Sequence, residues 1–147
     1  MAYVLGRKSR AELEGVHPRL VAVVEHAIKI TAVDFSVHDG LRTLEEQREY
    51  FRRGVSKTMR SKHLVQSDGY GHAVDLVPWI NGKLRWEWEP IYHIAAAVGH
   101  AAKEQGVELI WGGNWKQRMS EYVGNADDME AARNRTGGWD GPHYQLD

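Results

Sequence analysis

Hydrophobic residues recur at intervals of three and four in two long stretches, and this spacing predicts two amphipathic helices. The first runs from Pro18 to about residue 30, because proline suits the first turn of a helix. The second runs from Pro90 to about Gln105 and ends at Gly106. The predicted buried faces are Leu20, Val23, Val24, Ala27 and Ile28 in the first helix and Ile91, Ile94, Ala95, Val98, Ala101 and Ala102 in the second.

Capping signals predict two further helices. Thr43 and Glu46 form a capping box for a helix that ends at about Arg53. Ser9 is expected to cap a short helix over residues 10–15. The three main helices are therefore expected at about 18–30, 44–53 and 90–105.

Short runs of alternating polar and apolar residues predict strands between these helices. The strands are expected at 35–39, 73–77 and 108–111, followed by a last strand that carries Asp140 and His143. Asn81-Gly82, between two apolar runs, is a strong signal for a hairpin. Together these elements predict an α+β fold, in which a small antiparallel sheet is packed by about three main helices.

Residues 114–138 have the weakest pattern in the chain. Asp127, Asp128 and Glu130 predict the start of a short helix, where negative charge is favoured. The same acids could bind calcium, although their spacing lacks the regular acidic loop of a known calcium motif.

The composition predicts one globular domain over residues 1–147. The chain has 42% hydrophobic and 27% charged residues, and its 19 basic and 20 acidic residues give a net charge of −1. This balance does not point to nucleic acid or to a membrane surface. No stretch is long enough to span a membrane, and the N-terminus lacks the apolar run of a secretory signal. We therefore expect a monomer that is made in a cytoplasm, with no stable membrane insertion.

One segment, residues 48–62, is locally basic. A solvated helix face followed by a loop is the simplest interpretation, and the alternative is contact with an anionic polymer. The basic residues are Arg48, Arg52, Arg53, Lys57, Arg60 and Lys62.

The stretch from Ser61 to Asp75 carries the strongest chemical signal. Asp75 lies inside a predicted buried strand, where a carboxylate is costly unless its charge is compensated. A metal ion shared with His63 would supply that compensation, and His143 is the best candidate for a third ligand. His72 could replace either histidine. Because the chain has no cysteine, such a site would use only nitrogen and oxygen ligands, which is more typical of catalytic than of structural zinc.

Two other residues have the chemistry of a hydrolytic site. Asp140 lies three residues before His143, and the Gly141-Pro142 step between them can turn its carboxylate towards the metal, where a general base is needed. Arg42 lies where a predicted strand gives way to a helix, a common place for a functional side chain. A surface arginine paired with an acid is an equally good interpretation of Arg42.

The combined motifs resemble a family of metallopeptidases. This family includes the L-alanyl-D-glutamate endopeptidases of bacteriophages and the D-alanyl-D-alanine carboxypeptidases. The resemblance extends from about Leu13 to Leu146. It rests on Ser61-Lys62-His63, Gly71-His72-Ala73-Val74-Asp75, Trp139-Asp140-Gly141-Pro142-His143 and Gly40-Leu41-Arg42-Thr43 with Gln47.

The resemblance implies a role for each matching residue. His63, Asp75 and His143 would bind Zn²⁺, Asp140 would be the general base, and Arg42 would hold the substrate carbonyl or carboxylate and stabilise the oxyanion. Gln47 and Ser61 would contact the substrate. The gap between His63 and Asp75 is longer than expected, and we interpret residues 66–70 as an insertion at the rim of the cleft.

The implied activity is zinc-dependent cleavage of the L-alanyl-D-glutamate bond in the peptidoglycan stem peptide. The enzyme would be a phage endolysin without a separate wall-binding domain, and it would reach the periplasmic cell wall once the membrane has been opened. Two alternatives remain at this point. One is a D-alanyl-D-alanine carboxypeptidase with the same site, which the aspartate at position 140 disfavours because many such relatives have glutamate there. The other is a non-catalytic zinc-binding or wall-binding module.

Overall fold

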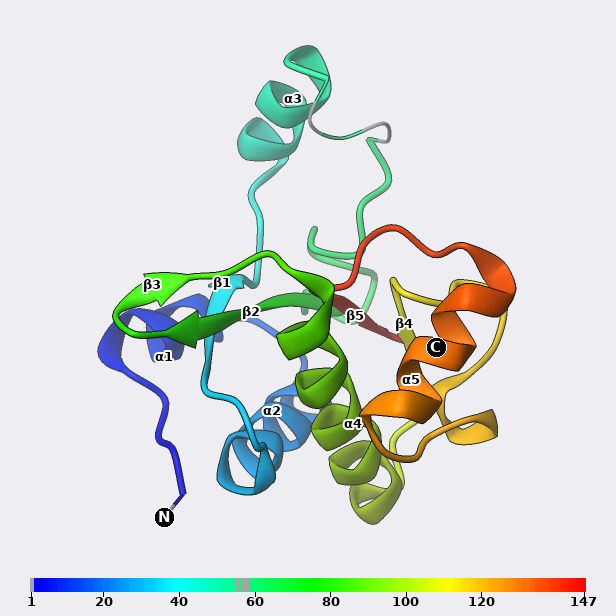
Figure 1. Ribbon diagram of the computed structural model, residues 1–147. Helices are drawn as coiled ribbons and strands as arrows, with labels where there is room; N and C mark the ends of the chain where they lie inside the picture. Colours follow the sequence, from blue (N-terminus) through cyan, green and yellow to red (C-terminus); the bar gives the residue numbers. More distant parts are fainter. Residues whose placement is uncertain (1, 55, 57–58) are drawn as a thin grey trace.

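The computed structural model describes residues 2–54, 56 and 59–147, and within these residues it contains one antiparallel sheet (Figure 1). The strands follow the order β1 (Phe35–Asp39), β2 (Ala73–Ile80), β5 (His143–Leu146) and β4 (Leu109–Trp111). A short strand, β3 (Lys83–Leu84), pairs with the far end of β2 through the Asn81-Gly82 turn. This arrangement confirms the predicted α+β fold and its hairpin.

The helices lie on both sides of this sheet (Figure 1). Helices α2 (Pro18–Ile30) and α4 (Trp88–Gln105) pack against each other beneath it, and α1 (Arg7–Glu12) contacts β1. Helix α3 (Leu44–Arg52) stands on the opposite side, above the sheet in Figure 1. A 3-10 turn (Met119–Glu121) and α5 (Ala126–Thr136) complete the structure beside α4.

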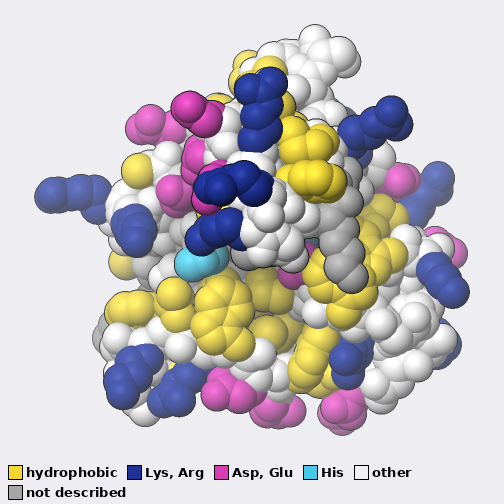
Figure 2. Space-filling view, turned by 90° about the horizontal axis from the view of Figure 1, so that it is seen from above, with side chains coloured by type: hydrophobic (Ala, Val, Ile, Leu, Met, Phe, Trp, Pro, Cys, Tyr) yellow, Lys and Arg dark blue, Asp and Glu magenta, His cyan; other side chains and the backbone are white. Residues whose placement is uncertain are grey.

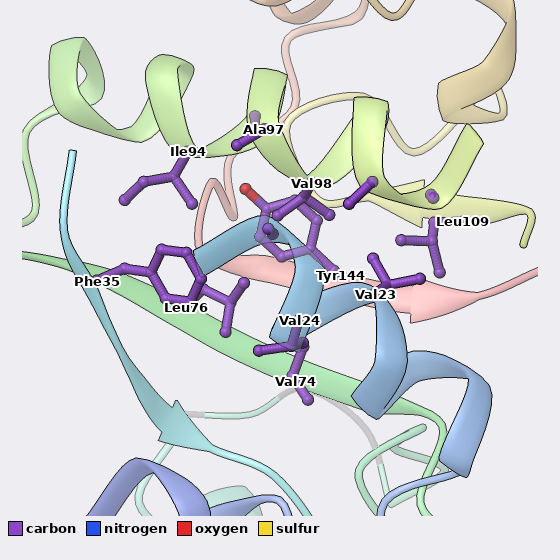
Figure 3. Packing of buried hydrophobic residues seen from close by; sticks show 14 of the residues in the cluster. Val23, Val24, Phe35, Val74, Leu76, Ile94, Ala97, Val98, Leu109 and Tyr144 are labelled. Carbon is purple, nitrogen blue, oxygen red and sulfur yellow. The ribbon is translucent and has the colours of Figure 1, made fainter. Parts of the chain in front are cut away.

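The hydrophobic core fills the space between the sheet and the pair α2 and α4 (Figure 3). Both predicted helical faces are buried there, as the periodicity requires. From the sheet, Val74 and Leu76 of β2 and Tyr144 of β5 point into the same cluster. Because side chains alternate along a strand, the neighbouring residues Asp75 and His143 point to the opposite face.

Two helices begin earlier than predicted. Helix α1 starts at Arg7, and Ser9 lies inside it rather than at its cap. The buried Ser9 hydroxyl instead accepts a hydrogen bond from the backbone N–H of Val37 in β1, at 3.0 Å. Helix α4 begins at Trp88, two residues before Pro90, because proline is tolerated anywhere in a first turn, where N–H groups have no partner within the helix.

The stretch with the weakest pattern contains a helix of 11 residues, α5, which is longer than the short helix predicted there. Asn125 caps it, and the carboxylate of Asp128 accepts the N–H of Asn125 at 2.8 Å, which completes a capping box. Met129 and Ala132 are its buried residues, so its sequence shows almost no hydrophobic period. None of the helices in the described ranges has the length and apolar character needed to cross a membrane.

Candidate metal centre

Strand pairing brings two of the predicted ligands together. Asp75 on β2 lies directly opposite His143 on β5 in the antiparallel register, although 68 residues separate them in sequence. Directly opposed residues point to the same face of a sheet. Their side chains therefore meet on the face that is turned away from the core.

His63 completes a group of three. It is buried in the loop before β2, and its Nε2 lies 3.3 Å from Asp75 Oδ1. His143 Nδ1 lies 3.2 Å from the same oxygen. One ligand atom from each of the three residues lies within 4.8 Å of the others, so His63, Asp75 and His143 could hold a metal ion.

The outer nitrogen of each of the two histidines has an acceptor on the side away from Asp75. His63 Nδ1 lies 2.8 Å from the carbonyl oxygen of Gly40, which can only accept, so this nitrogen carries the proton. His143 Nε2 donates in the same way to Gln145 Oε1, at 2.9 Å. The other ring nitrogens, His63 Nε2 and His143 Nδ1, face Asp75 and would offer their lone pairs to a metal ion bound between the three side chains. Metal-binding histidines are typically oriented by such outer acceptors.

The electrostatics of the group favour a negative Asp75. Burial alone would raise the pKa of Asp75, but hydrogen bonds with His143 and His63 hold this pKa far below its ordinary value. Burial opposes the charged form of His143 in turn, yet the hydrogen bond to Asp75 raises the pKa of His143. The carboxylate thus attracts positive charge to the position where the three side chains converge.

Asp140 lies in the loop before β5, not in the strand as we predicted. The Gly141-Pro142 step separates it from the first strand residue, His143, whose N–H donates to Asp140 O at 3.1 Å. Its side chain lines the same cavity as the three candidate ligands. Burial, and then the nearby charge of Asp75, raise the pKa of Asp140. The inward turn expected from Gly141-Pro142 is therefore observed.

Arg42 is buried and held in place by several partners. Its guanidinium binds Asp39 through Nε, at 3.1 Å, and through a second N–H, while a third N–H donates to Gln47 Oε1 at 2.7 Å. The Cζ atom of the Arg42 guanidinium lies over the ring of Tyr50 on α3, 4.6 Å from the ring centre. Arg42 also lines the cavity, so the junction between β1 and α3 does deliver it to the candidate site.

Gln47 and Ser61 support the residues around them. Gln47 is completely buried, and besides Arg42 its side chain contacts Ser56, to which its amide donates at 2.9 Å. Ser61 lines the cavity, and its hydroxyl accepts the N–H of His63 at 3.1 Å. Contact of either residue with a substrate stays a prediction, and Gln47 lies behind Arg42 in this structure.

The site opens into a cavity of about 800 Å³ between the sheet and the α3 segment. Figure 2 shows hydrophobic side chains gathered around a hollow on this face, with basic side chains above it. Arg60 and Lys62 of the basic segment line the cavity, whereas Arg52 and Arg53 form ion pairs with Glu49 on α3, as expected of a solvated helix face. Lys57 lies outside the described residues.

The predicted position of the loop 66–70 is wrong. Among the described residues that line the cavity, none comes from this loop. Asp68 instead lies 2.7 Å from His72 Nε2 and close to His17, at the N-terminus of α2. His72 precedes Asp75 by three residues, so strand alternation turns its side chain to the other face. The candidate ligand from this part of the chain is therefore His63.

Sequence reasoning missed several contributors to the site, among them Asp39, the Gly40 carbonyl, Trp115 and Gln145. Gln145 had a usable signal, because it follows His143 by two residues on a strand and so shares its face. Asp39 lies only three residues before Arg42, which it pairs with. The Gly40 carbonyl and Trp115 reach His63 and His143 from distant segments, and such contacts leave no local pattern.

Comparisons with known proteins place the chain in a family. A family model described as phage L-alanyl-D-glutamate peptidase matches residues 1–146. The L-alanyl-D-glutamate peptidase of Escherichia phage T5 is 29% identical over 150 residues, which cover 99% of each chain. The crystal structure of the Serratia marcescens L-Ala D-Glu endopeptidase ChiX is 39% identical with a TM-score of 0.73, over 98% of this chain and 90% of that one. The chain therefore belongs to the phage L-alanyl-D-glutamate peptidase family.

Proposed function

We propose that this peptidase hydrolyses the bond between L-alanine and D-glutamate in the peptidoglycan stem peptide, with Zn²⁺ held by His63, Asp75 and His143. The observation that carries the proposal is the convergence of three ligand atoms within 4.8 Å at a cavity. Family membership and the names of both relatives support this choice of bond. They do not favour the alternative of a D-alanyl-D-alanine carboxypeptidase.

The donor set fits zinc. Two imidazole nitrogens and one carboxylate oxygen, with no sulfur, are common ligands of catalytic zinc, which keeps a further position open. With their outer nitrogens donating to Gly40 O and Gln145 Oε1, both histidines would have their inner nitrogens available as ligands of the ion. When bound, zinc would polarise the peptide carbonyl and make water more acidic.

Asp140 is the proposed general base. It lines the cavity beside the three ligands without being one of them, so its carboxylate can accept the proton of the attacking water. Burial raises its pKa, which makes it a stronger base than an exposed aspartate. After cleavage, the same carboxyl group can pass the proton to the leaving amine.

Arg42 is proposed to stabilise the negative charge that develops on the substrate carbonyl oxygen. Asp39 and Gln47 hold its guanidinium in one orientation before the substrate arrives. We further propose that Ser61 positions the substrate or the His63 loop. The enzyme would act on the cell wall after the host membrane has been opened, as an endolysin of a phage would.

Mass spectrometry of purified peptidoglycan after digestion tests this function. We expect chelator-sensitive release of peptides that begin with D-glutamate, and recovery of activity when zinc is restored. Asp140→Asn should release almost no product while it still binds zinc. Release of free D-alanine would instead indicate a carboxypeptidase. Full activity of Asp140→Ala would contradict the role of Asp140 as general base, and a complete absence of products with zinc present would favour a non-catalytic binding module.

A further inference from the structure

Trp139 is exposed in an unusual place. Its side chain is 71% exposed, yet it lines the cavity that contains Asp140 and the candidate metal ligands. Most large aromatic residues are buried, and apolar surface left open beside a cleft is typical of a binding site. The indole therefore offers a flat apolar face at the mouth of the site.

A second tryptophan connects Trp139 to the candidate metal centre. The ring of Trp115 lies 5.1 Å from the ring of His143, and the ring of Trp139 lies 6.0 Å from that of Trp115. Both tryptophans line the cavity. Trp115 thus contacts both other rings, and the three rings form a row of successive contacts from His143 to the exposed Trp139.

The loop that presents Trp139 is held rigidly on both sides. Before it, Gly138 packs so closely on Gly113 that an added Cβ would lie 2.0 Å from the Gly113 carbonyl oxygen. After it, Asp140 packs in the same way on Gly112, and its N–H donates to Gly112 O at 3.1 Å. A platform fixed in this way loses little conformational freedom on binding.

We propose that Trp139, backed by Trp115, forms a subsite for the N-acetylmuramyl sugar that carries the stem peptide. This inference rests on the proposed function and adds the glycan to the recognised substrate. In peptidoglycan the amino group of L-alanine is joined to the lactyl group of this sugar. One residue and one lactyl group, at about 3.5 Å each when extended, place the sugar only about 7 Å from the scissile bond.

The position and chemistry of the row suit this occupant. A sugar at that distance falls within the two ring-to-ring steps from His143 to Trp139. A pyranose ring presents a face of C–H groups, which packs on an indole face while its hydroxyl groups stay in water. A single amino-acid side chain at the same distance from the scissile bond would not require an apolar surface as wide and exposed as the Trp139 indole.

Two substrates that differ only in the sugar provide the test. One is the N-acetylmuramyl tripeptide with L-alanine, D-glutamate and diaminopimelate, and the other is the same tripeptide with an acetyl group on L-alanine. We expect the wild type to prefer the muramyl substrate. Trp139→Ala should lower kcat/KM on that substrate about tenfold, mainly through KM, and should change the acetyl substrate less than about twofold. Trp139→Phe should recover part of the loss.

Trp79→Ala is the matched control, because Trp79 is also exposed but lies in β2 away from the cavity. It should leave both substrates unaffected. If Trp139→Ala slows both substrates equally, or neither, the sugar subsite is wrong. Equal cleavage of the two substrates by the wild type would also overturn the subsite but keep the proposed function. Cleavage of neither would refute both.

Discussion

At the scale of single residues, the candidate site depends on groups that orient the candidate ligands and Arg42. Both histidines are oriented by acceptors on their outer nitrogens, one by the backbone and one by Gln145. Arg42 is oriented by Asp39 and Gln47. The site therefore consists of the candidate ligands and Arg42 together with the groups that orient them. The supporting residues can be tested separately.

Gln145→Leu should weaken zinc binding. The substitution removes the acceptor of His143 Nε2–H, so the ring loses its fixed orientation and part of its basicity. Loss of such an outer partner typically reduces metal affinity about 10–100-fold. Competition with a chromophoric chelator measures this affinity directly. Gln105→Leu, an exposed change at the end of α4, is the control and should leave it unchanged. Equal affinities of the two variants would show that Gln145 does not support the metal.

Gln47→Leu should lower kcat without lowering zinc affinity. The buried amide is replaced by a side chain of similar size, and one guanidinium N–H of Arg42 loses its acceptor. An unsatisfied buried donor also costs about 1–3 kcal/mol of stability. Assays well below the unfolding temperature separate this cost from catalysis. Gln47→Glu keeps an acceptor for Arg42 and should retain more activity than the leucine variant. If the two variants were equally active, Gln47 would not act by positioning Arg42.

At the scale of elements, the site forms where five segments of the chain meet. Strands β2 and β5 supply Asp75 and His143, the loop before β2 supplies His63, and the junction of β1 and α3 supplies Arg42. Asp140 comes from a loop that packs on the turn after β4. The contacts between these segments fix the positions of the functional side chains. A substitution that shifts the backbone of one segment against another should therefore affect activity.

Gly40→Ala tests this dependence at one point. An added Cβ at residue 40 would lie 1.8 Å from the backbone oxygen of Glu12, so the end of β1 must move away from α1. The same residue provides the carbonyl that orients His63. We expect loss of zinc affinity together with a lower unfolding temperature. Gly6→Ala is a matched control, because no atom lies within 4 Å of the new Cβ. A Gly40→Ala variant with normal zinc affinity would contradict this account.

The success of sequence reasoning differed between elements for physical reasons. Helices α2 and α4 were predicted because burial of one face imposes a period on their residues. Helix α5 buries little, so its length was missed. The candidate ligands could be named from motif and resemblance, but their meeting depends on the register of β2 with β5, which no local pattern specifies. The misplaced loop 66–70 has the same cause, because its partner His17 lies far away in sequence.

At the scale of the whole molecule, the sheet separates the core from the site. Its lower face in Figure 1 packs on α2 and α4, and its upper face carries Asp75 and His143 towards the α3 segment. Among the residues that the structure describes, the core cluster contains 26 buried residues, none of which is a candidate metal ligand. Folding should therefore not require the metal, unlike small domains that a structural zinc holds together.

Removal of zinc should abolish activity but leave the chain folded. The chelated protein should keep its far-ultraviolet circular dichroism, since the core does not include the site. Zinc at about 100 times its dissociation constant adds about 2.7 kcal/mol of stability, so the unfolding temperature should fall by about 5–10 °C on chelation. Scanning calorimetry with and without a chelator measures this difference.

His143→Ala separates the metal from other effects of the chelator. This variant lacks one candidate ligand, so its unfolding temperature should be the same with and without chelator, while the wild type shifts. Unfolding of the wild type on chelation would mean that the metal holds the fold together, against the separation of core and site. An identical shift in both proteins would mean that the stabilising ion binds elsewhere, and that the convergence of His63, Asp75 and His143 is not its site.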